Sequence, residues 1–346
     1  MANRTQYETF MTALTSAQAV SPIATMIQKL SDGVFEETPL LKYLKENCKR
    51  PLEGGPAITF QIKTTATRSQ GFSGDGSITV SQSTTDYKKP VLMRNFQVYP
   101  VKYNLTDVAI NKGKDAMVNY VAERIVDAKE GIARTLTLDL YGDGTNSADG
   151  TAMTGDPLVG LALAVEPTPA TSGNSYAGIT RSASTTYFNN QYLAAASTIG
   201  SLTVSNLEEM TLRCTHGGKT PDLIITNDTA FAKIKALFAN DRRFVPGSSK
   251  SIDGGFPTVF TFNGASLFSD KHLTASSKGG VLSADKKVIY FLNTKDAMEY
   301  RVDPEWDMKL TGTLEAIESN TYVQKLIHSS CFCVTNPRFC GVITYA

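Results

Sequence analysis

Apolar residues are sparse at the start of the chain and then become periodic. Residues 1–20 are polar with scattered apolar positions, which is typical of an extended arm. Ser21 is a suitable N-cap, Pro22 fits the first helical position, and Gly33 would end the helix that they begin. The pattern predicts a second short helix over Pro39–Asn47.

The stretch 56–104 has the period of two that is typical of strands. Ile58 and Ile62 alternate with polar residues, and a second extended segment is predicted over Pro90–Tyr103. Between them, residues 71–77 are rich in Gly, Ser and Asp. This pattern predicts a long two-stranded excursion. Because an isolated hairpin is marginal in water, it needs a platform, which either the same chain or another copy provides.

The longest helical pattern covers Thr106–Leu140. Apolar residues recur there at three- and four-residue spacing: Met117, Val121, Ile125, Ala128, Ile132 and Leu136. A helix of about 30 residues would span roughly 45 Å, well above the mean length of about 11–12 residues.

Helical and strand patterns then alternate over 158–300, which indicates a compact α/β lobe. Helices are predicted over Asn206–Thr215 and from Asn227 or Asp228 to Phe238. Strands are predicted in this lobe over Pro221–Thr226, Thr258–Phe262, Ala265–Phe268 and Val288–Leu292. Beyond the lobe, a long strand is predicted over Tyr322–Val334 and a last one over Cys340–Tyr345. Asn263-Gly264 is a strong hairpin signal. The fold class predicted for the whole chain is α+β.

The composition limits the classes of protein that the chain could belong to. Charged residues make up 19% of the chain, below the usual ~25%, and charge is depleted at buried interfaces. A weakly charged monomer, a secreted β-rich protein or a chain covered by neighbours would all fit. With 34 Lys and Arg against 33 Asp and Glu, a dedicated nucleic-acid binder is not expected. Neither an apolar membrane span nor a signal peptide is present, so a reducing cytoplasm without a membrane partner is expected.

The five cysteines indicate packing rather than a disulfide framework. Cys331 and Cys333 lie near His328 and Cys340, which raises the possibility of a metal site. The spacing contains no CxxC pair, however, and a strand cannot easily fold these four residues around one ion. Buried thiols are the preferred interpretation.

No catalytic constellation is found. Gly173–Ala177 imitates a nucleophile elbow but follows no strand. Asp139, Asp143 and Asp149 crowd one loop, but Tyr141 occupies a calcium-ligand position, so solvated turn aspartates are expected. The histidines lie far apart: His216, His272 and His328. No catalytic residue, metal site or cofactor is therefore expected, and the chain is not expected to be an enzyme.

Several short segments occur in a characteristic order. They are Gly160-Leu161, Tyr176–Arg181, Pro221–Asn227, Gly255-Phe256-Pro257 and Asn336–Gly341. Together with the excursion and the long helix, this order resembles the major capsid proteins of tailed bacteriophages, which share the Hong Kong 97-type fold. Tyr176–Arg181 is similar to the family's YGGIxR segment, with Ala177 in place of the first glycine.

The resemblance implies a division of the chain. It assigns 1–55 to an N-terminal arm and short helices, 56–104 to the E-loop, 105–154 to a P domain with the spine helix, 155–300 to the A domain, 301–335 to P-domain return strands and 336–346 to a C-terminal strand. In the family, the E-loop lies over a neighbouring subunit. A second copy would then be the platform.

The resemblance also suggests residues for inter-subunit contact in the E-loop. These are Lys63, Arg68, Phe72, Asp75, Lys88 and Lys89. Some family members join subunits by a Lys–Asn isopeptide bond, for which the three lysines qualify by location only. Ordinary solvated lysines are the favoured alternative, and a clean monomer after boiling in detergent would exclude the bond.

The implied function is a major capsid protein whose pentamers and hexamers form an icosahedral shell around double-stranded DNA. The partners would be the portal protein, separate scaffolding or decoration proteins, and DNA through non-specific contact. Arg124, Lys129 and Arg134 on the long helix would either face that DNA or be ordinary solvated residues. The site of assembly would be the host cytoplasm and the final location the virion. The alternatives are an encapsulin-like nanocompartment shell protein, a phage tail-tube or fibre protein, and an enzyme.

Overall fold

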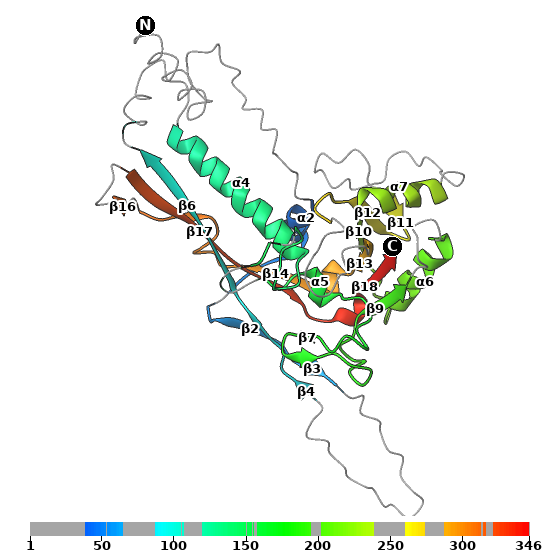
Figure 1. Cartoon of the computed structure of the whole chain (residues 1–346). Coiled ribbons are helices and arrows are strands. Elements are labelled where there is room, and N and C mark those ends of the chain that lie inside the picture. Colours follow the sequence, from blue (N-terminus) through cyan, green and yellow to red (C-terminus); the bar gives the residue numbers. More distant parts are fainter. Residues whose placement is uncertain are drawn as a thin grey trace, which may run out of the picture. The chain divides into compact units, whose positions relative to one another are not determined.

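A computed structural model describes most of the chain (Figure 1). The described residues are 39–52, 54–64, 87–104, 106, 120–149, 151–153, 155, 158–194, 202–238, 260–273, 287–312, 314–315 and 321–345. The arm and the helix predicted at Ser21 lie outside them. The chain divides into two units. The smaller unit consists of Met1–Glu37, Val98–Ile132 and Met308–Ile327. The larger unit consists of Thr38–Gln97, Ala133–Asp307 and His328–Ala346.

The larger unit is built around a six-stranded mixed sheet. Its strands are β9 (Gln191–Ala194), β10 (Leu223–Thr226), β11 (Phe260–Phe262), β12 (Ala265–Ser269), β13 (Lys287–Leu292) and β18 (Gly341–Tyr345), in the order β11-β12-β10-β13-β18-β9. The β10–β12 and β18–β9 pairs are parallel and the others antiparallel. Every residue of β10 is buried, as its continuous apolar sequence predicts.

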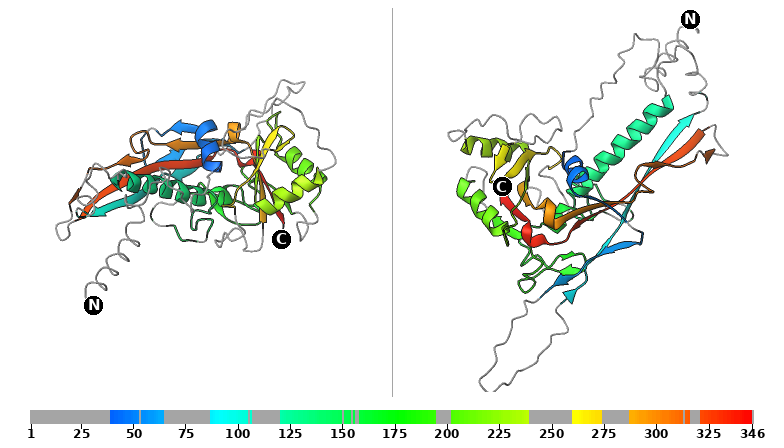
Figure 2. Two further views of the ribbon diagram at one scale, coloured as in Figure 1. Left: turned by 90° about the horizontal axis from the view of Figure 1, so that it is seen from above. Right: turned by 180° about the vertical axis from the view of Figure 1, so that it is seen from behind.

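Two helices accompany this sheet (Figure 2). Helix α6 (Val204–Cys214) begins after Thr203, whose side chain accepts a hydrogen bond from the Asn206 amide. It therefore starts two residues before the predicted helix. Helix α7 (Asp228–Leu237) begins after Asn227, which caps it as predicted. The two helices and the sheet share one apolar core, which includes Leu207, Met210, Ile224, Phe231, Phe291 and Ile343.

Tight turns follow the sequence signals closely. Asn263 and Gly264 connect β11 and β12 with φ values of 47° and 84°, so the predicted hairpin is confirmed. The short apolar run from Leu158 forms helix α5 (Leu161–Ala164). After it come β7 (Ser175–Tyr176) and β8 (Ile179–Thr180), which pair across a two-residue turn.

A second sheet contains the longest strand, β17 (Thr321–Val334), close to its predicted bounds. In the larger unit, β14 (Met298–Val302) pairs antiparallel with the end of β17, and β1 (Lys49–Pro51) pairs in parallel with β14. In the smaller unit, β15 (Lys309–Leu310) and β16 (Leu314–Glu315) pair with its beginning. Strand β6 (Asn95–Asn104) also pairs with β17. The structure also contains helices α2 (Pro39–Asn47) and α8 (Thr294–Ala297) and the 3₁₀ turn η2 (Pro337–Phe339).

The long helix α4 is described over Tyr120–Leu140, and residues 107–119 of the predicted helix lie outside the described part. Ala128, Ile132 and Leu136 are buried as the periodic pattern predicts. Gly131 faces Tyr99, because a Cβ at this glycine would lie 3.1 Å from the tyrosine Cε2 atom. No described helix is long and apolar enough to cross a membrane.

The β7–β8 turn gives a first testable prediction. Ala177 and Gly178 have φ values of 51° and 79°, and a non-glycine residue in this region is strained. We expect Ala177→Gly to raise the free energy of unfolding by about 0.5–1 kcal/mol, after allowing for the greater freedom of glycine in the unfolded chain. Urea denaturation measures this. The matched change Gly178→Ala, where a Cβ would meet no atom within 4 Å, is expected to lower stability, and the reverse order would contradict the prediction.

Candidate functional site

The base of the predicted excursion is a two-stranded stem, hereafter the stem (residues 57–63 and 87–93). Strands β2 (Ala57–Thr59) and β5 (Val91–Met93) form one antiparallel ladder, and β3 (Ile62–Lys63) and β4 (Tyr87–Lys88) form another. Both ladders have the same register, so no residue is bulged between them. The extended segment expected over Pro90–Tyr103 is interrupted at Arg94, between β5 and β6.

The two faces of the stem differ sharply. Ile58 and Leu92 lie opposite each other on one face and are buried. On the other face, Tyr87 is 66% exposed, Met93 58% and Val91 43%. Exposed large apolar side chains gathered on one face are typical of an interaction surface.

The base of the stem rests on its own chain. The Val91 amide donates a hydrogen bond to the Ala177 carbonyl at 3.0 Å. The Cys331 thiol lies 3.5 Å from the Met93 carbonyl, and Lys88 Nζ lies 5.9 Å from the centroid of the Tyr187 ring. The platform left open by the sequence is therefore intramolecular for this part of the excursion.

The structure describes only some of the predicted contact residues. Lys63 and Lys88 lie on adjacent strands of the stem, and Lys89 follows directly; all three are exposed. Arg68, Phe72 and Asp75 lie outside the described residues.

Sequence reasoning missed Tyr87, Val91 and Met93, the residues of the exposed apolar face. All three occupy odd-numbered positions, so on a bulge-free strand they share one face. That parity, together with their size, was the available signal.

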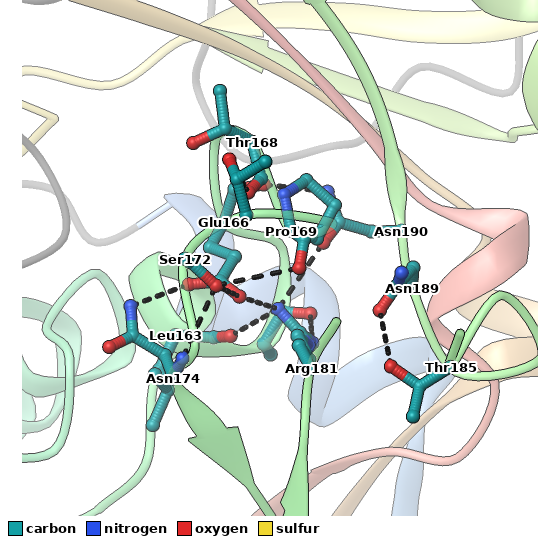
Figure 3. Close-up of polar contacts among 12 residues, drawn as sticks. Leu163, Glu166, Thr168, Pro169, Ser172, Asn174, Arg181, Thr185, Asn189 and Asn190 are labelled. Carbon is teal, nitrogen blue, oxygen red and sulfur yellow. Dashed lines mark hydrogen bonds and ion pairs between the residues drawn. The ribbon is translucent and has the colours of Figure 1, made fainter. Parts of the chain in front are cut away.

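The segment that resembles YGGIxR supports a buried polar network rather than a reactive site (Figure 3). Arg181 and Glu166 are fully buried and form an ion pair at 3.2 Å. The guanidinium also donates to the carbonyls of Leu163 at 2.9 Å and Ala164 at 2.6 Å. Arg181 thus satisfies carbonyl groups at the end of α5, which would otherwise lack partners.

The Glu166 carboxylate also accepts hydrogen bonds from residues other than Arg181. Ser172 Oγ donates to Oε1 at 2.6 Å and Asn174 Nδ2 to Oε2 at 2.8 Å. Asn190 Nδ2 donates to the Glu166 carbonyl at 2.8 Å. Burial lowers the pKa of Arg181, and the attraction of Glu166 opposes this effect. Both carboxylate oxygens of Glu166 therefore have partners, and the geometry is that of a structural network.

One predicted solvated aspartate is in fact buried. Asp139 accepts hydrogen bonds from Ser147 at 2.5 Å and Gln97 at 2.8 Å, and burial raises its pKa. The expectation for Asp139 was therefore wrong, because Ser147 and Gln97, which lies 42 residues earlier in the chain, satisfy its carboxylate away from solvent. Asp143 behaves as a turn residue: its carboxylate accepts from the amides of Thr145 and Asn146 at 2.8 Å each.

The cysteines are all free and buried, as expected for packing residues. Burial raises the pKa of Cys331 and of Cys340 to about 12, so neither thiol ionises readily. Among the described residues, no three His, Cys, Asp or Glu side chains are grouped to hold a metal ion.

His328 forms a buried polar cluster with groups from neighbouring segments. Its Nδ1 atom lies 3.2 Å from Asp307 Oδ1, and its Nε2 atom 3.2 Å from Tyr300 Oη. Burial lowers the pKa of His328 to about 4; Asp307 opposes this shift, whereas the positive charges of Lys45 and Lys49 reinforce it. His328 is therefore neutral in the folded protein at pH 7.

This cluster predicts a loss of stability in mild acid. The pKa of His328 is lower in the folded than in the unfolded state, so the unfolded state binds more protons between pH 6.5 and about 4. Stability is retained above pH 6.5 and falls as the pH drops through this window, with a contribution of about 3 kcal/mol at most. Urea denaturation at pH 7 and 4.5 measures the change. His328→Gln is expected to flatten this pH dependence, and an unchanged slope in that variant would contradict the assignment.

Comparison with known proteins identifies the fold. No family model matches the chain, and neither does any curated protein sequence. The capsid of cyanophage A-1(L) matches with a TM-score of 0.66 at 18% identity, covering 92% of this chain and 95% of that one. The capsid of a native GTA particle matches with a TM-score of 0.61 at 12% identity, covering 95% and 98%.

An encapsulin is also similar. The holo-SrpI encapsulin complex of Synechococcus elongatus PCC 7942 matches with a TM-score of 0.58 at 12% identity, covering 95% of this chain and 94% of that one. At these identities the shared property is the fold. The chain therefore has the α+β, Hong Kong 97-type capsid fold, and the predicted fold class is confirmed.

Proposed function

We propose that this protein is the major capsid protein of a tailed phage and that its copies self-assemble into the icosahedral shell around a double-stranded DNA genome. The observation that carries the proposal is the fold match to capsid structures along nearly the whole chain. The exposed apolar face at Tyr87, Val91 and Met93 supports it, because a face of this kind is suited to burial against another copy.

The proposal includes partners and a location. Pentamers and hexamers would tile the lattice, with a portal protein and separate scaffolding or decoration proteins as further partners. Contact with packaged DNA would be non-specific, in keeping with a net charge of +1. The mature location would be the virion, after assembly in the host cytoplasm. No catalytic role is proposed.

The inter-subunit contacts proposed for the excursion involve Arg68, Phe72 and Asp75 together with Lys63, Lys88 and Lys89. Exposure of the three lysines on or beside the stem supports this assignment. If a lysine forms an isopeptide bond between subunits, a gel run after boiling in detergent is expected to show a series of bands above the 37.4 kDa monomer. A single monomer band would exclude the bond.

A nanocompartment shell is the second candidate, favoured by the similarity to the encapsulin. Electron microscopy of the purified protein tests both proposals, because closed shells are expected and a monomer at high concentration would refute them. The contents separate the two: nuclease-protected double-stranded DNA in particles from infected cells indicates a capsid, and an enclosed protein indicates a nanocompartment.

A further inference from the structure

Arg94 lies where the stem joins the rest of its unit. It separates β5, which pairs with β2, from β6, which pairs with β17. On the other side of the stem, the connection that leads into β2 contains Gly54 and Gly55, with φ values of 55° and 79°. A Cβ at Gly54 would meet no atom within 4 Å. Because glycines have wide conformational freedom, the Gly54-Gly55 connection alone does not fix the direction of the stem.

The Arg94 guanidinium connects three segments at this junction. Nη2 donates to Asp303 Oδ2 at 2.5 Å and to Ser329 Oγ at 2.9 Å. Nε donates to Ser329 Oγ at 3.1 Å, and Nη1 donates to the Gly55 carbonyl at 3.3 Å. The guanidinium also lies 4.4 Å from the centroid of the Phe96 ring. A single planar side chain therefore connects both chain segments at the base of the stem to β17 and to the residue that follows β14.

The groups that receive Arg94 are themselves held in place. The Arg94 and Asp303 side chains are each 12% exposed, so salt screens the pair only weakly. Burial would raise the pKa of Asp303, but hydrogen bonds from the Glu305 amide and from Arg94 keep it below its usual value. Ser329 Oγ donates to the Asn95 carbonyl at 3.1 Å. The anchor for Arg94 is thus preorganised.

We propose that Arg94 is a latch that fixes the direction of the stem before subunits meet. The inference rests on the proposed shell function. Without Arg94, the stem would be held at this junction by weaker contacts such as the Val91–Ala177 hydrogen bond. It would then point correctly for a smaller fraction of the time, and the apparent affinity between copies would fall by that fraction. Arg94 is a positioning residue: it lowers the ordering cost of assembly without contacting the neighbouring copy.

Hydrogen exchange and assembly of the full-length protein test the latch together. In Arg94→Gln, we expect the Val91 amide, which donates to the Ala177 carbonyl outside the stem, to exchange about tenfold faster or more, because charge-assisted hydrogen bonds at the base are lost. Exchange in β10 and β13 is expected to stay unchanged, and the yield of closed shells is expected to fall. Arg94→Lys, which keeps the charge but not the planar fork, is expected to restore assembly only in part.

The matched control is Arg50→Gln. Arg50 pairs with Glu299 at 2.9 Å on the same sheet but is 59% exposed, and this change is expected to leave stem exchange and shell yield unaltered. If stem exchange in Arg94→Gln equals that of the wild type, or rises equally in β10 and β13, the latch is refuted. Faster stem exchange with normal shell yield refutes its role in assembly. Failure of the wild-type protein to form shells would instead count against the proposed function.

Discussion

Replacing Glu166 with alanine is expected to cost about 3–5 kcal/mol of folding free energy, the range seen when one partner of a buried ion pair is removed. Arg181 would keep its charge in a fully buried site without its counter-ion. Ser172 and Asn174 would also lose the carboxylate that accepts their hydrogen bonds. Because domains are stable by only about 5–15 kcal/mol, this loss is a large share of the total. The shift of the urea midpoint of the full-length protein measures it.

An exposed ion pair is the control for this prediction. Glu209 and Arg213 lie 2.6 Å apart on α6, with side chains 47% and 44% exposed. We expect Glu209→Ala to cost less than about 1 kcal/mol, because solvent screens such pairs. The double replacement Glu166→Leu with Arg181→Met removes the unpaired charge but leaves the Leu163 and Ala164 carbonyls without Arg181, so it is expected to recover only part of the lost stability. If Glu166→Ala behaved like Glu209→Ala, the network would not have the structural role given to it.

This network also shows how a short segment can connect several distant elements. Tyr176 Oη accepts a hydrogen bond from the Val334 amide at 2.9 Å, and Arg181 meets the end of α5. One segment therefore connects β7, β17 and α5 within the larger unit. Side chains with such distant partners are costly to replace, since each leaves a buried polar group unsatisfied.

The elements that the sequence predicted well are those whose signals are local. The Asn227 cap of α7, the Asn263-Gly264 turn and the alternation that marks β17 each depend on residues close together in the chain. The stem was predicted for the same reason. The order of the short segments then suggested the fold, and the structural comparisons confirmed it.

Features that depend on distant partners could not be predicted. Asp139 is buried because Gln97 and Ser147 satisfy its carboxylate. The sequence pattern in the stem indicated strands but not which face meets the β7–β8 turn, so the exposed side of Val91 and Met93 stayed unknown. No local sequence pattern marked Arg94, whose partner Asp303 lies 209 residues later in the chain.

The fold and the stem together suggest how contacts between copies could stabilise a shell. A closed shell needs heterologous contacts related by rotation, each of modest size. Contacts made later form at high effective concentration, so weak individual contacts produce a stable assembly. In this proposal the stem positions the residues beyond it, and we expect those residues, together with the exposed face of the stem, to supply the contact.

Deleting residues 66–84 is therefore expected to leave a soluble, folded subunit that forms no stable shells. The deletion spares the β3–β4 ladder, in which Lys63 pairs with Tyr87, and the residues that remain make a connection of hairpin length. The core around β10 and β13 lies elsewhere in the chain, so the urea midpoint is expected to change little. Arg68, Phe72 and Asp75 are removed, and the proposed contacts with the neighbouring copy are lost with them. Sedimentation and electron microscopy measure the outcome.

Replacing 66–84 with a Gly/Ser segment of equal length separates reach from contact. If the side chains carry the contact, this variant also fails to form shells, because a flexible linker provides length without specific burial. If length alone matters, it assembles like the wild type, and the residue assignments to Arg68, Phe72 and Asp75 are wrong. Intact shells from the deletion itself would remove residues 66–84 from the assembly mechanism, since the copies would then be held by surfaces outside that segment.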